Sequence, residues 1–262
     1  MEIAFNAIGI EIANEAAFND LAEDVGTRGE ASHLTRQSGV LRARCLKLGA
    51  GLEVWSVLYE TDSGEIFHVD YRPAFRARYA QNISPWVLTE IDREGAAAIH
   101  GFVADRETEI LFELQNLTEV GAGILEHNVL RVGLCGLAYR AEVLQTPESF
   151  FRRAHDEIVL NIAADENDWS LCGKVLDLNA LRNHRSGSDL YWIYLDTGEF
   201  NLEIMVNRRD LDGENLQVGD YLKADVWLQG HILSDVPARN SYEGVDLRHS
   251  AVDFWKKFKR PN

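Results

Sequence analysis

The side chains able to bind a metal ion are thinly spread in this sequence, which contains eight histidines. His68 and Asp70 stand two residues apart in an alternating stretch, so both would project from one face of a strand and could ligate one ion. No HExxH motif, paired CxxC motif or second group of ligands accompanies them. The sequence therefore predicts no metal centre, although an enzyme or metal-binding site near this pair stays an alternative.

Nucleophilic and phosphate chemistry also lacks its usual local motifs. Cys45, Cys135 and Cys172 lie in apolar stretches with no neighbouring histidine to act as a base. Gly49-Ala50-Gly51 and Gly121-Ala122-Gly123 lack the third glycine of a dinucleotide-binding loop, and neither a GxSxG motif nor a P-loop occurs. The sequence predicts no catalytic residue and no cofactor. Three widely spaced cysteines predict buried, reduced thiols and a cytoplasmic location.

Two groups of side chains are better suited to binding. The first is a group of aromatic rings: Tyr191, Trp192, Tyr194 and Trp227. The second is a group of arginines in the segment YRPAFRARY: Arg72, Arg76 and Arg78. Tryptophan, tyrosine and arginine carry much of the binding energy at protein interfaces. The guanidinium groups can grip a ligand's carboxylate or phosphate, or neutralise acids of the same chain.

The aromatic group lies in a stretch that predicts a small β-barrel. Turn clusters separate four clear strands: Cys172–Leu178, Leu190–Leu195, Asn201–Val206 and Tyr221–Ile232. Leu190–Leu195 is apolar on both faces, which predicts that another element covers its outer face. The pattern of five short strands resembles an OB-type barrel, and this resemblance implies that single-stranded nucleic acid could stack on the rings. Apolar residues at helical spacing predict a final helix over residues 250–259. We therefore predict an OB-like, five-stranded antiparallel barrel with a C-terminal amphipathic helix over residues 169–262.

Residues 1–145 predict a β-rich α+β domain that begins with a β-α-β-β-β unit. The predicted elements are a strand at Ile3–Ile12, a helix capped by Asn14 and closed by Gly26, a loop at Thr27–Gly39, and strands at Val40–Leu48, Leu52–Glu60 and Glu65–Tyr71. Further strands are predicted at Ala97–Ala104, Ile110–Leu114 and Val129–Leu144. The opening unit resembles the half-module of the vicinal-oxygen-chelate family, which holds metals with histidine and glutamate on strands. No second module follows it.

A helix is predicted to connect the two domains. Thr146 can cap it, Pro147 suits its first position, and Glu148 favours its positive end. With the acidic turn that follows, this segment spans residues 146–168. A faint repeat relates His100–Val103 to Cys172–Val175, which leaves open whether the chain is duplicated or contains two β-units with similar turns.

The charge balance opposes binding to polyanions. Asp and Glu number 42 against 26 Lys and Arg, giving a formal net charge of −16, and both halves of the chain are acidic. Nucleic acid is thereby disfavoured without being excluded. No apolar run approaches the roughly 20 residues that span a bilayer, so no membrane is predicted. The leading prediction is a non-enzymatic cytosolic protein-interaction module, with a homodimer as the simplest partner. Single-stranded nucleic-acid binding and an enzyme or metal protein are the alternatives.

Overall fold

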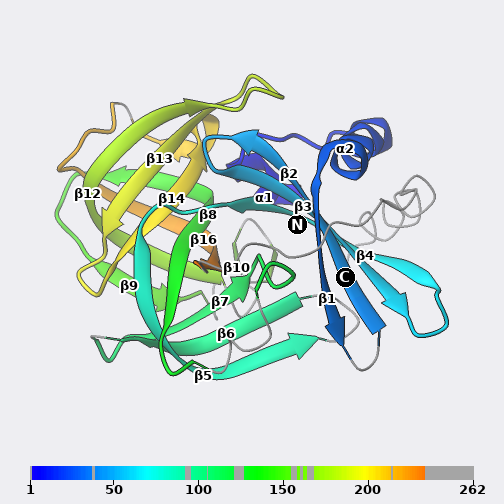
Figure 1. Cartoon of the computed structure of the whole chain (residues 1–262). Helices are drawn as coiled ribbons and strands as arrows, with labels where there is room; N and C mark the ends of the chain where they lie inside the picture. The colour runs from blue at the N-terminus through cyan, green and yellow to red at the C-terminus, as the bar shows by residue number, and fades with distance from the viewer. Residues whose placement is uncertain are drawn as a thin grey trace.

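The structure is a computed structural model that describes residues 2–36, 39–91, 96–104, 106–120, 127–154, 158–159, 162–163, 168–213 and 215–233 (Figure 1). Most of these residues form β-strands, which assemble into a four-stranded sheet, a ten-stranded sheet and a two-stranded ladder. The β-rich prediction is confirmed. No helix in these ranges is both long and apolar enough to cross a bilayer.

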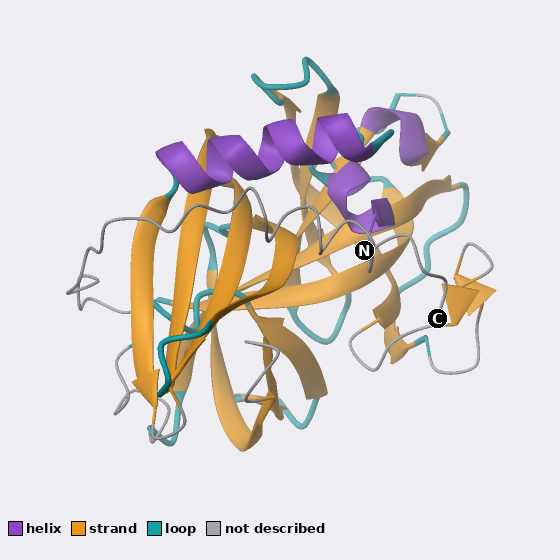
Figure 2. Cartoon of the chain, turned by 90° about the vertical axis from the view of Figure 1, so that its right-hand side faces the viewer, coloured by secondary structure: helices purple, strands orange, loops and turns teal. Residues whose placement is uncertain are grey.

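The four-stranded sheet is an antiparallel meander packed beneath a helix. Its strands, in spatial order, are β1 (Glu30–Arg36), β2 (Gly39–Gly49), β3 (Leu52–Thr61) and β4 (Ile66–Phe75). Helix α2 (Glu15–Arg28) lies across one face of this sheet and buries Phe18, Leu21 and Val25 (Figure 2). Asn14 caps α2, as predicted, because its side-chain oxygen accepts a hydrogen bond from the Ala17 amide at 2.9 Å.

Three predictions for the N-terminal unit are wrong. A helix, α1 (Glu2–Ala7), replaces the strand expected at Ile3–Ile12, and α2 continues past Gly26 to Arg28. Strand β1 occupies most of the loop expected at Thr27–Gly39. The apolar residues of α1 fall at too many consecutive positions to distinguish a helix from a strand. Strand β1 is an edge strand whose side chains are mostly exposed or half-buried, so it lacks an apolar alternation.

The ten-stranded sheet contains strands from both halves of the chain. Its longer members are β5 (Ala80–Ile91), β6 (Ala96–Val103), β7 (Glu109–Leu114), β8 (Leu130–Leu144), β12 (Asp168–Arg182), β13 (Asp189–Asp196), β14 (Asn201–Asn207) and β16 (Tyr221–Ile232). Its short members are β9 (Phe150–Arg153) and β15 (Leu211–Asp212), and the separate ladder pairs β10 (Ile158–Val159) with β11 (Ile162–Ala163). A 3-10 turn, η2 (Arg208–Asp210), follows β14.

Strands β8 and β16 form a long antiparallel ribbon that closes two rings (Figure 1). In one ring β5, β6 and β7 form a meander, β7 pairs in parallel with β16, and β8 pairs with β5. In the other ring β12, β13 and β14 form a meander, β14 pairs in parallel with β8, and β16 pairs with β12. Each half of the chain therefore supplies the strand that closes the other half's ring.

The two rings correspond strand by strand. Strands β5, β6, β7 and β8 match β12, β13, β14 and β16, in that order. Cys135 and Gln229 face each other across the β8–β16 ribbon, so their outer partners, Glu203 and Glu113, are equivalent. Equivalent side chains also make equivalent bonds: Trp169 Nε1 donates to the Leu111 carbonyl at 2.9 Å, and Gln81 Nε2 donates to the Asn201 carbonyl at 2.9 Å. This match pairs β6 with β13. The register of the repeat seen in the sequence, which compared β6 with β12, is therefore wrong.

The structure changes how the predicted domain elements connect. Phe150–Arg153 forms β9, which pairs with β12, where a connecting helix was expected within residues 146–168. After Pro147, the large side chains Phe150 and Phe151 pack beside the start of β12, and Phe151 stacks on Trp169 at 4.0 Å. The ring built on β12–β14 takes β8 from the predicted first domain and includes a parallel pair. The helix expected at residues 250–259 lies outside the described residues.

Candidate binding face

The three arginines predicted as a binding group are bound to the chain's own acids and rings. Arg72 lies 3.0 Å from Asp70 and 2.7 Å from Glu113. Arg76 lies 2.7 Å from Glu53 and 3.0 Å from Glu119, and Arg78 stands over the Trp192 ring at 5.0 Å. The segment therefore joins the small sheet to the large one, which matches the intramolecular interpretation of these cations.

The carboxylate of Glu203 is the centre of this junction. It accepts hydrogen bonds from the Arg78 amide at 2.5 Å, the Tyr79 amide at 2.7 Å and Trp192 Nε1 at 2.5 Å. The residue is 1% exposed, and this burial raises the pKa of the Glu203 carboxyl even though all three donors oppose the rise. Glu203 is thus a structural acceptor that holds the chain crossing above it.

The four predicted aromatic residues do not form one open face. Trp192 is 2% exposed: its Nε1 donates a hydrogen bond to Glu203, and the Arg78 guanidinium lies over its ring. Tyr191 packs half-buried against the core of the rings, while Tyr194 and Trp227 pack half-buried against the second core beneath α1 and α2. Tyr79, which stacks on Tyr194 at 4.3 Å, is 44% exposed and is thus far more open than Trp192.

The His68 and Asp70 pair is also part of the small sheet. The register of β4 against β3 shifts between Val57 and Leu58, the two residues that face Asp70 and His68. His68 stacks on Tyr71 at 4.3 Å, and Asp70 faces Arg72. Within the described ranges, no three histidine, cysteine, aspartate or glutamate side chains gather as a metal ion would require.

A more open face lies on the outer side of β5 and β6. Trp86 is 69% exposed, with Val87 at 43% and Phe102 at 36%. The Trp86 ring lies 6.3 Å from the Phe102 ring and 5.4 Å from the His100 ring. Trp86 and Val87 both remain exposed because β5 bulges between Pro85 and Val87, which interrupts the alternation of its side chains. We call Trp86, Val87 and Phe102 the aromatic strip.

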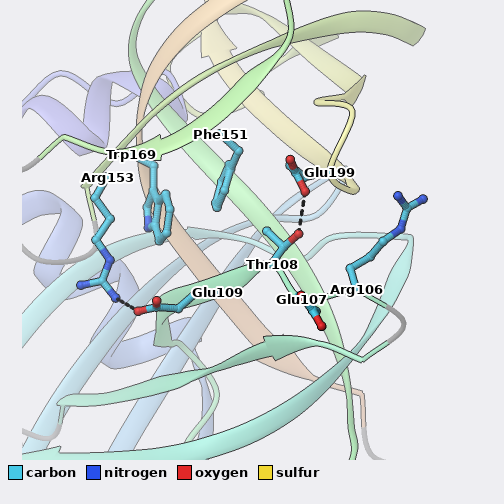
Figure 3. A pocket seen from close by; sticks show the side chains of 8 residues that line it. All are labelled: Arg106, Glu107, Thr108, Glu109, Phe151, Arg153, Trp169 and Glu199. Carbon is cyan, nitrogen blue, oxygen red and sulfur yellow. Dashed lines mark hydrogen bonds and ion pairs between the residues drawn. The ribbon is translucent and has the colours of Figure 1, made fainter.

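A pocket of about 600 Å³ opens near the strip, at the start of β7 (Figure 3). It is lined by Arg106, Glu107, Thr108, Glu109, Phe151, Arg153, Trp169 and Glu199. Glu109 connects the pocket to the strip, because its carboxylate lies 2.6 Å from His100 and 3.1 Å from Arg153. Thr108 donates its hydroxyl to Glu199 at 2.8 Å. The rings of Trp169 and Phe151 form the apolar part of the lining.

Sequence reasoning did not select either the strip or the pocket. It made no assignment for Ala80–Ile91, because Pro85 interrupts a stretch that would otherwise predict a strand. Pro85 was itself the available signal, because a proline inside a strand marks an edge strand or a bulge. The pocket unites β7, β9 and β12, which are far apart in the sequence, so no local motif marks it.

Comparisons with known proteins leave the function open. Residues 156–230 match a family model described as "Domain of unknown function, E. rectale Gene description (DUF3881)". The matched segment covers β12–β14 and most of β16 but neither β8 nor the aromatic strip. A search of curated proteins and a search of solved structures each found no match to the chain.

Proposed function

We propose that this chain is a non-enzymatic protein-interaction module that self-associates through the aromatic strip. The observation that carries the proposal is the exposure of Trp86, at 69%, beside Val87 and Phe102 on one sheet face. Contiguous exposed apolar side chains of this size are typical of interaction sites, and tryptophan is the residue most enriched among binding hot spots.

The strip can supply a useful binding energy. A tryptophan side chain buries about 150–250 Å² when it is fully covered. For a ring that is 69% exposed, covering the remainder contributes roughly 3–4 kcal/mol at about 25 cal/mol per Å². This contribution must offset the loss of translational and rotational freedom on association. A single ring therefore supports a weak contact, and Val87 and Phe102 are needed to enlarge it.

A second copy of the chain is the partner that we propose. The residues beside the strip carry both signs of charge: Glu109 and Arg153 pair at its edge. A two-fold contact places the same patch on both sides, so such a mixed edge can pair opposite charges. The net charge of −16 repels two copies at long range, and salt screens this repulsion. Self-association is therefore expected to strengthen as salt rises.

Sedimentation velocity over a range of protein concentrations tests this proposal. The wild-type chain should associate more tightly at about 0.5 M salt than at about 0.05 M. Trp86→Ser should weaken the association at least tenfold, whereas Phe67→Ser, at a ring 52% exposed on the other sheet, should leave it unchanged. A wild-type chain that stays monomeric at every concentration and salt would remove the proposal. So would equal effects of the two substitutions.

We also propose that the ring of β12, β13, β14, β8 and β16 is an OB-like barrel that takes its closing strand from residues 130–144. Its support is the three-strand meander closed through one parallel pair. A cytoplasmic location is proposed with it, supported by three buried cysteines in place of a disulfide framework. Single-stranded nucleic acid is the alternative ligand of this ring. Its binding would weaken as salt rises, whereas self-association should strengthen.

A further inference from the structure

We infer that the pocket at the start of β7 is a binding site for a cationic group, a guanidinium or a primary ammonium. This site lies beside the aromatic strip and does not depend on self-association. Its lining combines two aromatic rings, Trp169 and Phe151, with three carboxylates and two arginines.

Counted over the described residues that line it, the pocket offers more free acceptors than free donors. The Thr108 hydroxyl already donates a hydrogen bond to one oxygen of Glu199, and the Arg153 guanidinium donates one to Glu109. Within the part of the chain that the structure describes, Glu107 has no ion-pair partner and only one oxygen of Glu199 accepts a hydrogen bond. Among the described lining residues, Arg106 is the cation without an ion-pair partner, and Figure 3 shows it extending away from the Trp169 and Phe151 rings. A ligand rich in donors fits this balance.

The chain's own Arg153 shows how this lining holds a cation. Its guanidinium carbon lies 5.6 Å from the centre of the Trp169 ring while its NH2 group lies 3.1 Å from the Glu109 carboxylate. Aromatic faces attract cations, and guanidinium groups combine stacking with hydrogen bonds to carboxylates. Phe151 and Glu199 line the side of the pocket that Arg153 does not occupy and supply a ring and a carboxylate there (Figure 3). The Phe151 ring itself stacks on Trp169 at 4.0 Å and lies nearly perpendicular to the Phe200 ring at 4.8 Å.

Glu109 and Glu199 also occupy equivalent places in the two rings. Counting back four residues from the equivalent Glu113 and Glu203 gives Glu109 and Glu199. Both line the one pocket. The pocket therefore brings together Glu109 at the start of β7 and Glu199 in the turn before β14, and Trp169 and Phe151 line it beside them. An anion would have to approach both carboxylates and would meet Arg106 as its sole unpaired counter-charge among the described lining residues.

The test is a titration with N-acetyl-arginine amide, followed by the NMR shifts of the Trp169 indole N–H and the Thr108 and Glu109 amides. N-acetyl-norleucine amide is the uncharged control and N-acetyl-glutamate amide the anionic one. The arginine probe should give saturable shifts at these groups that neither control reproduces. No saturable shift, an equal response to norleucine, or tighter binding of the glutamate probe would each overturn the inference.

Charge variants sharpen this test. Glu107→Gln and Glu199→Gln together should lower the affinity for the arginine probe at least tenfold, whereas Arg106→Gln should raise it about twofold to threefold, because a like charge is removed. Glu65→Gln, exposed in the turn before β4, changes the net charge by the same amount as one pocket variant and should leave the affinity unchanged. Unchanged binding in the double variant, with its amide spectrum still that of the folded chain, would overturn the site. Measurements on Trp86→Ser separate this site from self-association, since that variant should keep the arginine affinity.

Discussion

Cys135 of β8 lies directly opposite Gln229 of β16, and a glutamate stands beside each of them on the next strand outward. Glu203 pairs in parallel register with Cys135, and Glu113 pairs with Gln229. The segment after Arg72 crosses this row and is held by it. Arg72 binds Glu113, Gln229 Nε2 donates to the Pro73 carbonyl at 2.9 Å, and Glu203 accepts the amides that follow. The symmetric row thus fixes the small sheet onto the rings.

The first prediction concerns the acceptor at one end of this row. Glu203→Gln replaces one carboxylate oxygen with an NH₂ group that faces three donors, so at least one buried donor loses its acceptor. We expect the free energy of unfolding to fall by about 2–3 kcal/mol, as for other buried unsatisfied groups. Urea denaturation measures it, with Glu142→Gln on an exposed position of β8 as the control. A loss of less than about 0.5 kcal/mol would contradict the role given to Glu203.

The second prediction tests the correspondence of the two rings. A Cβ on Gly136 would lie 2.9 Å from the Val226 Cβ, and a Cβ on Gly230 would lie 2.5 Å from Cδ2 of Phe112 and 2.9 Å from Cγ1 of Val132. In the match of the two rings, Gly136 corresponds to Gly230 and Val132 corresponds to Val226. Alanine at either glycine should therefore destabilise the chain by about 1–3 kcal/mol, as overpacking does. Combining Gly136→Ala with Val226→Ala should cost less than the sum of the single changes. Urea denaturation measures these costs. If they are additive, the contact between residues 136 and 226 is not the cause of the lost stability.

The third prediction concerns pH. His231 is 4% exposed, and burial, with the nearby Arg76, lowers its pKa to about 3. Above the ordinary histidine pKa both the native and the unfolded chain carry a neutral ring. Between about 6.5 and about 3 the unfolded chain binds a proton that the native chain does not, so this residue's contribution to stability falls as pH falls, by up to about 1.4 kcal/mol per pH unit.

His231→Gln removes this titration. The unfolding free energy of the wild type should therefore decline relative to that of the variant as the solution is taken from about pH 7 to about pH 4, which urea denaturation at each pH measures. Because the comparison uses the change with pH, a constant cost of the substitution does not affect it. Parallel pH profiles for the two proteins would show that His231 becomes protonated in the native chain as readily as in the unfolded one.

The fourth prediction concerns the helix that covers the small sheet. Asn14 accepts the Ala17 amide at 2.9 Å and starts α2. Asn14→Ala should lower the free energy of unfolding by about 1 kcal/mol, whereas Asn14→Ser should cost little because serine caps equally well. Urea denaturation of both variants checks this expectation. Equal losses in the serine and alanine variants would mean that the cap is not the source of the effect.

Much of the strand pattern could be predicted from the sequence. The Gly49-Ala50-Gly51 turn was a local signal, since all three residues take positive φ values between β2 and β3. Alternation over residues 129–144 and 221–232 identified the two strands of the central ribbon, β8 and β16. What local patterns do not specify is the partner of each strand. The pairing of β8 with β14 and of β7 with β16 joins segments from opposite halves of the chain.

The candidate site was harder to predict, for a related reason. Trp192 lies in a strand that is apolar on both faces, which predicts a cover, but nothing local identifies the segment carrying Arg78 and Tyr79 as that cover. Trp86 follows a proline that obscured its strand, and the bulge there exposes it. In both cases a distant segment or a local irregularity decides the exposure of the ring, and neither is contained in the periodicity of apolar residues.

A distance measurement between two copies tests the central claim of self-association most directly. The three native cysteines are buried, and burial raises their pKa values, so a cysteine introduced at the exposed Thr89 of β5 can be labelled selectively with a spin label. At high salt, pulsed dipolar spectroscopy on Thr89→Cys should give one narrow intermolecular distance distribution, which Trp86→Ser abolishes. Absence of any intermolecular dipolar coupling at Thr89, in a sample concentrated enough to associate, would contradict a two-fold contact through the aromatic strip.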